Sequence, residues 1–130
     1  MTETVLWANP YPAYQFDAQA VDLSESVDNF DYIKVTFAAS NSNMTDLRSV
    51  IFSVNDFKTY LGGADDVNKR DFMCSPAFSK SGGLYSVYIR TFFYKPATNQ
   101  VYFNQGLYVD TPTTAVTYAK PTVIVGIKIS

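Results

Sequence analysis

The sequence predicts an all-β fold, an antiparallel β-sandwich of jelly-roll type with about eight short strands. Three observations predict it. The chain has 13 Val and 6 Ile against 6 Leu, with 12 Thr, 10 Tyr and 10 Phe, and branched and aromatic side chains suit a pleated, half-buried surface. Several segments alternate between apolar and polar residues, and turn residues separate them at short intervals. A small β-barrel is the second architecture that fits. The length of 130 residues fits one domain, 1–130.

The first half of the chain supplies four of the expected strands: 4–7, 16–23, 31–39 and 50–54. The clearest alternation is in 31–39, where Ile33, Val35, Phe37 and Ala39 share one face, as in a strand with one packed face. The segment 50–54 is apolar except for Ser53 and predicts a buried strand. After it, Asn55 and Asp56 are expected to cap one helical turn.

The second half begins with the longest break, 61–70, which predicts a surface loop. A strand interrupted by Pro76 is expected over 71–78, and the longest strand over 84–94. The turn 96–99 should return that strand to 101–103 as a hairpin. Thr111 and Pro112 are expected to break the chain. In the last strand, 122–129, Val123, Val125, Ile127 and Ile129 are expected to share one face, with Ile124, Gly126 and Lys128 on the other.

Charge and cysteine content narrow the range of possible partners. The net charge is −2, and the 10 basic residues are spread along the chain, so we expect no clustered positive surface that could bind nucleic acid. No apolar run is long enough to insert in a membrane. The single cysteine, Cys74, predicts a fold without an intrachain disulfide. The segment that starts at Met1 lacks a secretory signal pattern. If this protein acts outside the cell, we expect it to be released by lysis or as part of an assembly.

The absence of histidine argues against an enzyme. It removes the commonest general base, the Ser-His-Asp and Cys-His arrangements, and nearly every zinc site. Without an imidazole to activate it, Cys74 is expected to be a small buried hydrophobe. Asp65, Asp66 and Asn68 offer oxygens but lack the order of a calcium loop, so neither metal nor cofactor is expected. Paired carboxylates can hydrolyse glycosides without histidine, and this alternative stays open.

Aromatic residues, 16% of the chain, give the one positive indication of function. Tyrosine combines a flat apolar face with a polar tip and suits interfaces and sugar rings. We expect Trp7, which lies before a proline turn, to be largely buried. The candidate ligand or interface residues are tyrosines in loops or at strand ends and polar residues of the long loop: Tyr11, Tyr14, Tyr60, Tyr94, Tyr108, Asp65, Asp66 and Asn68.

A resemblance rests on the terminal segments 5–10, 16–19, 21–24, 29–35 and 125–129. In this order they resemble a domain of virion proteins from tailed bacteriophages of Gram-positive and gut bacteria, often the C-terminal part of a tail fibre, baseplate or other appendage protein. The resemblance implies a β-rich appendage domain, usually a homotrimer, that contacts the host or decorates the particle. It implies no ligand residues. This chain starts at its own Met1 without a fibrous shaft, which departs from that pattern.

The expected function is therefore a virion structural protein, an appendage or fibre-tip module that contacts other virion proteins and adheres to host cell-wall saccharide. One alternative is a head or tail decoration protein with a purely structural role. The others are a glycan hydrolase that uses paired Asp, and a cellular lectin unrelated to phage.

Overall fold

The computed structural model describes residues 1–11, 16–38, 47–60, 72–73, 77–81, 84–108, 111–116 and 120–130, with side chains in 1–11, 16–38, 47–58, 90–106 and 120–130. Its described part is all-β apart from the short helices η1 (Val27–Asn29) and α1 (Val54–Tyr60). No helix there is long and apolar enough to cross a membrane. The strands are β1 (Thr2–Ala8), β2 (Gln19–Asp22), β3 (Tyr32–Ala38), β4 (Leu47–Ser53), β5 (Phe72–Met73), β6 (Ala77–Ser81), β7 (Leu84–Ile89), β8 (Thr91–Lys95), β9 (Gln100–Phe103), β10 (Gly106–Tyr108), β11 (Thr111–Val116) and β12 (Lys120–Lys128).

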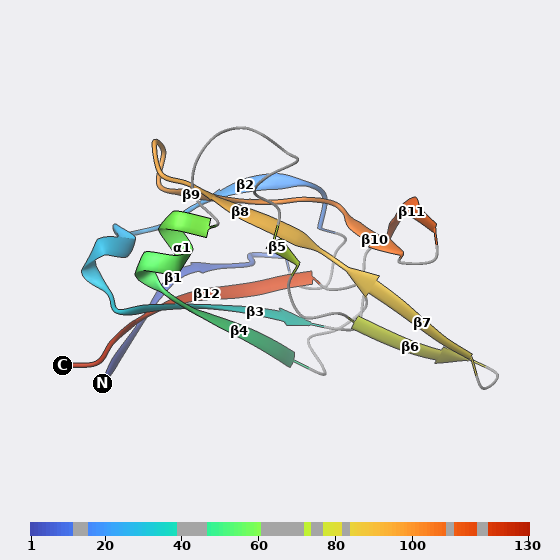
Figure 1. Ribbon diagram of the computed structural model, residues 1–130, viewed down its shortest axis with the longest axis horizontal. Coiled ribbons are helices and arrows are strands. Elements are labelled where there is room, and N and C mark those ends of the chain that lie inside the picture. Colours follow the sequence, from blue (N-terminus) through green and yellow to red (C-terminus); the bar gives the residue numbers. More distant parts are fainter. Residues whose placement is uncertain are drawn as a thin grey trace.

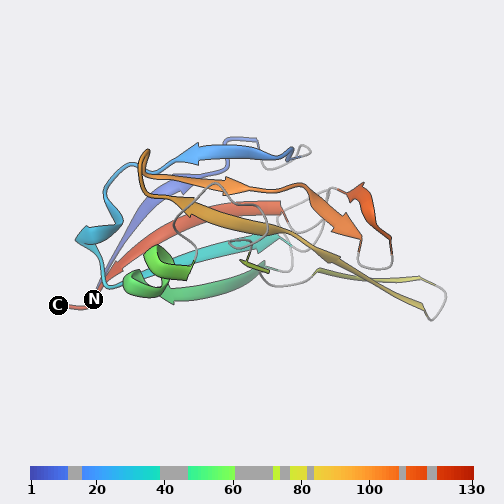
Figure 2. The ribbon, with the colours of Figure 1, turned by 45° about the horizontal axis from the view of Figure 1, so that its top comes forward.

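Two antiparallel four-stranded sheets form the sandwich that the sequence predicts (Figures 1 and 2). The terminal sheet has the order β1-β12-β3-β4, and the hairpin sheet has the order β2-β9-β8-β5. A third four-stranded sheet, the distal sheet, has the order β11-β10-β7-β6. Both chain ends lie at one end of the sandwich, and β6 and β7 extend from the other (Figure 1).

The core fills the space between the two main sheets. Ile33, Val35 and Phe37 of β3 are buried, which confirms the alternation in this segment. Phe37 meets Phe92 of β8 and Phe103 of β9, with ring centroids 6.0 and 6.1 Å apart. These contacts join the layers, because β3 belongs to the terminal sheet and the other two strands to the hairpin sheet.

The longest predicted strand, 84–94, is divided in the structure. β7 pairs in the distal sheet and β8 in the hairpin sheet, and Arg90 stands between them. Its side chain is 0% exposed, and its guanidinium Nη1 donates to the carbonyl oxygens of Phe16 at 3.2 Å and Asn104 at 2.8 Å. Alternation alone did not predict this break, because a strand that passes from one sheet to another keeps its apolar pattern. The hairpin of β8 and β9 is confirmed.

Three further expectations are wrong in detail. The segment 50–54 is not a buried strand: β4 is the last strand of the terminal sheet, and Ile51 is 59% exposed. α1 begins at Val54, and Ser53 Oγ accepts the N–H of Asp56 at 3.1 Å, so the capping side chain precedes the expected Asn55 and Asp56. Thr111 and Pro112 do not break the chain but open β11.

β12 carries apolar residues on both faces. Ile124 belongs to the core, and the ring of Phe30 lies where a Cβ on Gly126 would stand. Val125 and Ile127 therefore point away from the hairpin sheet, and both are nevertheless buried. The strand lies between β1 and β3. The sequence indicated which residues share a face of this strand but not which face meets the core.

Candidate functional site

An open pocket of about 350 Å³ lies between the end of β1 and β2. It is the site where predicted and newly found residues meet. The described residues that line it come from three places: the end of β1, the segment that follows it, and the segment 16–22. They include Trp7, Asn9, Tyr11, Phe16, Gln19 and Asp22.

Asn9 fixes the chain where it leaves β1. Its backbone N–H donates to Thr122 O at 2.8 Å, and its Nδ2 donates to Pro121 O at 3.1 Å. Its Oδ1 accepts the N–H of Tyr11 at 2.8 Å, an Asx-type bond that turns the backbone locally. Tyr11 is thereby held at the pocket rim, where its side chain is 68% exposed.

The wall of the pocket is a group of aromatic rings. Trp7 packs against Phe16 edge-on at 5.9 Å and against Phe103 at 5.8 Å. Behind Phe16, the guanidinium of Arg90 lies 5.5 Å from the ring centroid, within the range of a cation–π contact. Trp7 was expected to be largely buried, but it is only partly buried, because it also lines the pocket.

Polar groups complete the lining. Asp22 Oδ1 accepts Gln100 Nε2 at 2.7 Å, and Gln19 Nε2 donates to Asp17 O at 3.1 Å. These bonds orient both side chains and leave further acceptor capacity on the carboxylate and the amide oxygen. Asp22 is the only charged residue of the pocket lining that the structure describes, and this lining includes no Lys or Arg. An apolar ring wall with oriented acceptors suits a neutral polyhydroxylated ligand.

The structure brings only one of the predicted site residues, Tyr11, into this pocket. Tyr94 is buried in the core at 4% exposure, so in the folded chain it is not available to contact a ligand or partner. Its hydroxyl needs a partner there and donates to Asn99 Oδ1 at 2.9 Å. Tyr60 ends α1 and Tyr108 lies in β10. The side chains of these two residues lie outside the described residues, as do Tyr14, Asp65, Asp66 and Asn68.

Sequence reasoning missed Trp7, Asn9, Gln19 and Asp22 as pocket residues. A usable signal was present: Asn9 and Pro10 predict a turn, and a turn can bring the aromatic residues on its two sides close together. The exposed side of 16–23 was also expected, but nothing in the sequence placed it beside the end of β1. That proximity depends on the packing of the two sheets.

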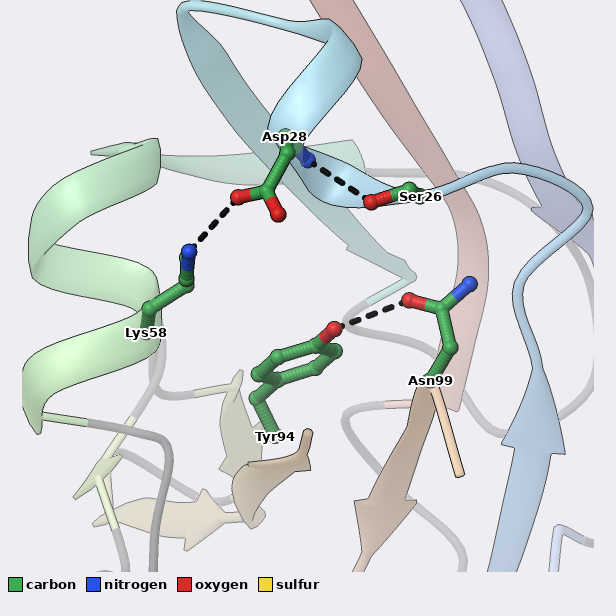
Figure 3. Close-up of polar contacts among 5 residues, drawn as sticks. All are labelled: Ser26, Asp28, Lys58, Tyr94 and Asn99. Carbon is green, nitrogen blue, oxygen red and sulfur yellow. Dashed lines mark hydrogen bonds and ion pairs between the residues drawn. The ribbon is translucent and has the colours of Figure 1, made fainter. Parts of the chain in front are cut away.

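A polar network of Ser26, Asp28, Lys58, Tyr94 and Asn99 lies around η1, α1 and the hairpin of β8 and β9 (Figure 3). Lys58 of α1 binds Asp28 of η1 at 2.6 Å, and this hydrogen bond, with the charge of Asp28, raises the pKa of Lys58. Asn99, in the turn between β8 and β9, has a positive φ of 52°. Its Nδ2 donates to Glu25 O at 2.9 Å. The network joins η1, α1 and the hairpin, and we assign it a structural role.

Asn99→Ala is expected to lower the free energy of unfolding by about 2–3 kcal/mol. The three hydrogen bonds of the Asn99 side chain, with the Tyr94 hydroxyl, Leu23 O and Glu25 O, are lost. The hydroxyl of Tyr94 is left buried without its acceptor, and alanine tolerates positive φ poorly. Asn99→Gly loses the same bonds but keeps the backbone conformation, so it should be more stable than the alanine variant by about 1 kcal/mol. Urea denaturation measures both. Equal stability of the two variants would contradict a role for the backbone conformation.

Tyr94 makes stability depend on alkaline pH. Burial, followed by the charge of Asp28, raises the pKa of the Tyr94 phenol. In the unfolded chain this phenol ionises near its ordinary value of about 10, so above that pH the folded state binds more protons. The free energy of unfolding should therefore fall as pH rises from about 10 towards the raised pKa. Tyr94→Phe should show a shallower decline in denaturation between pH 9 and 11, and an unchanged slope would count against this assignment.

Comparison of the sequence with models of known protein families and with curated proteins finds no match. The class of protein is thus defined by the fold and the pocket: a β-sandwich with an open aromatic site. Within the parts of the chain that the structure describes, no three residues of His, Cys, Asp or Glu gather as a metal-binding group.

Proposed function

We propose that the chain is an adhesion module of a bacteriophage particle that binds neutral saccharide of the host cell wall in the pocket at Trp7 and Tyr11. The observation that carries the proposal is the shared lining of the pocket by aromatic rings and oriented acceptors. The apolar faces of sugar rings pack on aromatic side chains, while sugar hydroxyls donate to carboxylates and amides.

The charge of the pocket indicates which saccharides fit. Asp22 disfavours phosphate-rich or carboxylate-rich polymers, since no described lining residue offsets their charge. Uncharged hexose and N-acetylhexosamine units match the acceptors without this penalty. The volume of about 350 Å³ is at the lower end of ligand sites. A single pocket is therefore expected to bind weakly, and many copies on one particle would supply avidity.

The location on a phage particle is supported by the resemblance of the terminal segments. Two of them, 5–10 and 125–129, include residues of β1 and β12, which pair with Val5 opposite Val125. A second role, structural decoration of the particle, is supported by a different surface, the exposed apolar side of the terminal sheet. Both roles can coexist in one chain, because the pocket lies beside β2 and not on that side.

The test of the adhesion proposal is the retention of purified protein on host cell walls and its calorimetric titration with neutral cell-wall oligosaccharides. Tyr11→Ala should weaken binding by about tenfold or more, the equivalent of about 1.4 kcal/mol. Tyr32→Ala is the matched control, because Tyr32 is also an exposed tyrosine but lies on the terminal sheet. Equal binding by the wild type and Tyr11→Ala would contradict the assignment of the pocket.

A further inference from the structure

The main-chain groups of β2 point alternately to β9 and to the open edge of the hairpin sheet. β2 is the first strand of that sheet, and β9 is its one partner among the described strands. In an antiparallel pair, opposite residues alternate between those that exchange two backbone hydrogen bonds and those that exchange none. Leu23, just beyond β2, donates its N–H to Asn99 O at 3.2 Å. Asp22, opposite Gln100, therefore belongs to a pair that exchanges none, and so does Ala20. The N–H and C=O groups of both residues are directed to the open edge.

A second contact gives the same direction and closes one end of this edge. Ser24 lies two residues beyond Asp22, and its N–H donates to Leu6 O of β1 at 3.0 Å. The Oγ of Ser24 donates to Val5 O at 3.4 Å. The pocket lies between the end of β1 and β2, and Ala20 and Asp22 both line it. It is therefore a gap between two strands that are joined at Ser24, and the open edge of β2 forms one of its sides.

The open edge adds donors to a pocket whose oriented side chains offer acceptors. The carboxylate of Asp22 accepts Gln100 Nε2 at 2.7 Å, and Gln100 Oε1 in turn accepts Thr98 Oγ1 at 2.9 Å. These two bonds fix which end of the Gln100 amide faces Asp22. The main-chain N–H of Ala20 is a donor, and a ligand that covers it without an acceptor leaves it unpaired at a cost in free energy. A matching ligand therefore brings an acceptor for the edge, a hydroxyl for the carboxylate and an apolar group for the ring wall.

The acetamido group of an amino sugar meets these requirements. Its carbonyl oxygen is an acceptor of the backbone kind, its methyl group can pack on Trp7 and Phe16, and a neighbouring hydroxyl can donate to Asp22. A plain hexose has a hydroxyl group in place of the amide. An extended peptide also pairs with open strand edges. However, β2 has only four residues, and its edge is closed at Ser24, which favours a short group over a strand.

We propose that the pocket selects N-acetylhexosamine, and that the acetamido carbonyl oxygen accepts the main-chain N–H of Ala20. Ala20 lies further from the closed end at Ser24 than Asp22 does, so its N–H is the donor that we assign. The inference rests on the proposed function and deepens it, because it names one sugar class among the neutral saccharides. It also makes the backbone of β2, and not a side chain, the group that determines specificity.

Calorimetric titration with matched sugars tests the selectivity. N-acetylglucosamine should bind about tenfold or more tightly than glucose, and N-acetylgalactosamine than galactose, as expected for one additional well-formed hydrogen bond and its methyl contact. Tyr11→Ala should weaken both members of a pair and keep their ratio. Equal affinities within each pair would overturn this inference and leave the adhesion role standing, whereas binding of neither member would contradict both. Tighter binding of glucosamine than of N-acetylglucosamine would show that the charge of Asp22, and not the amide, selects the ligand.

Replacement of a single backbone amide by an ester tests the assigned donor. Lactic acid at position 20 substitutes an oxygen for the N–H of Ala20 and keeps the side chain. The preference for the N-acetyl sugar should then fall to near one, with the affinity for glucose unchanged. The same replacement at Val21, whose N–H is directed to β9, is the matched control: it should lower the melting temperature and keep the preference. A preference that survives the loss of the Ala20 N–H would overturn the proposal. Tighter binding of N-acetyl-alanine methylamide than of N-acetylglucosamine would assign the edge to peptide instead.

Discussion

Arg90→Met is expected to lower the free energy of unfolding by about 3–4 kcal/mol. Its Nη1 donates to the carbonyl oxygens of Phe16 and Asn104, and each oxygen left without a donor in the interior costs about 1–3 kcal/mol. The contact of the guanidinium with the ring of Phe16 is lost as well. Because methionine is neutral, the variant no longer has the free-energy cost of burying the charged guanidinium, and this offsets part of the loss. Thermal and urea denaturation measure the change.

Arg90→Lys is the matched control. Lysine keeps the positive charge but lacks the planar fork that reaches two acceptors from one fixed position. It should therefore recover only part of the lost stability. Because Arg90 lies behind the aromatic wall, both variants should also weaken saccharide binding under conditions where they are fully folded. If Arg90→Met is as stable as the wild type, the cost of burying the charge equals the value of its contacts, and the account given for the break at residue 90 is wrong.

Gly126→Ala is expected to lower the free energy of unfolding by about 2–3 kcal/mol through overpacking. A Cβ at this position would stand 2.6 Å from Cγ of Phe30, far inside van der Waals contact. Phe30 is buried and follows directly on η1, so its ring cannot move without displacing that turn. In an ordinary strand the same substitution would be favourable, because glycine weakens strand interiors.

A double-mutant cycle isolates the contact between Gly126 and Phe30. Phe30→Ala alone is expected to cost about 3–5 kcal/mol, as for other buried phenylalanines. In that background the added methyl group at position 126 meets no ring, so Gly126→Ala should cost less than about 0.5 kcal/mol. An equal cost of Gly126→Ala in both backgrounds would place the strain in the backbone rather than at Phe30. Chemical denaturation of the four proteins provides the comparison.

The fold class was predictable because it depends on local patterns. The alternation of Ile33, Val35 and Phe37 is the direct imprint of one packed face, and the turn before Gln100 marks the hairpin of β8 and β9. The faces of β12 were not predictable, because apolar residues occupy both of them. Which side meets the core depends on the position of the strand within the sheet, and only the register with β1 and β3 gives that.

The candidate site was predictable only at Tyr11. Its place after Asn9 and Pro10 marks an exposed turn residue. Tyr94 also lies close to a proline, Pro96, but it is buried in the core. Asp22 joins the pocket through pairing of β2 with β9, which are far apart in the sequence. Contacts of this kind depend on tertiary packing and leave no local signature.

The central claim is that the pocket holds saccharide and does not transform it, and the single tryptophan of the chain offers the most direct measurement. Trp7 lines the pocket, so all tryptophan fluorescence of the chain comes from this pocket and should change when a ligand occupies it. Titration with neutral cell-wall oligosaccharides should give a saturable change in emission, with every oligosaccharide recovered at its original mass. Unchanged emission up to millimolar ligand, or recovery of shortened oligosaccharides, would contradict the account.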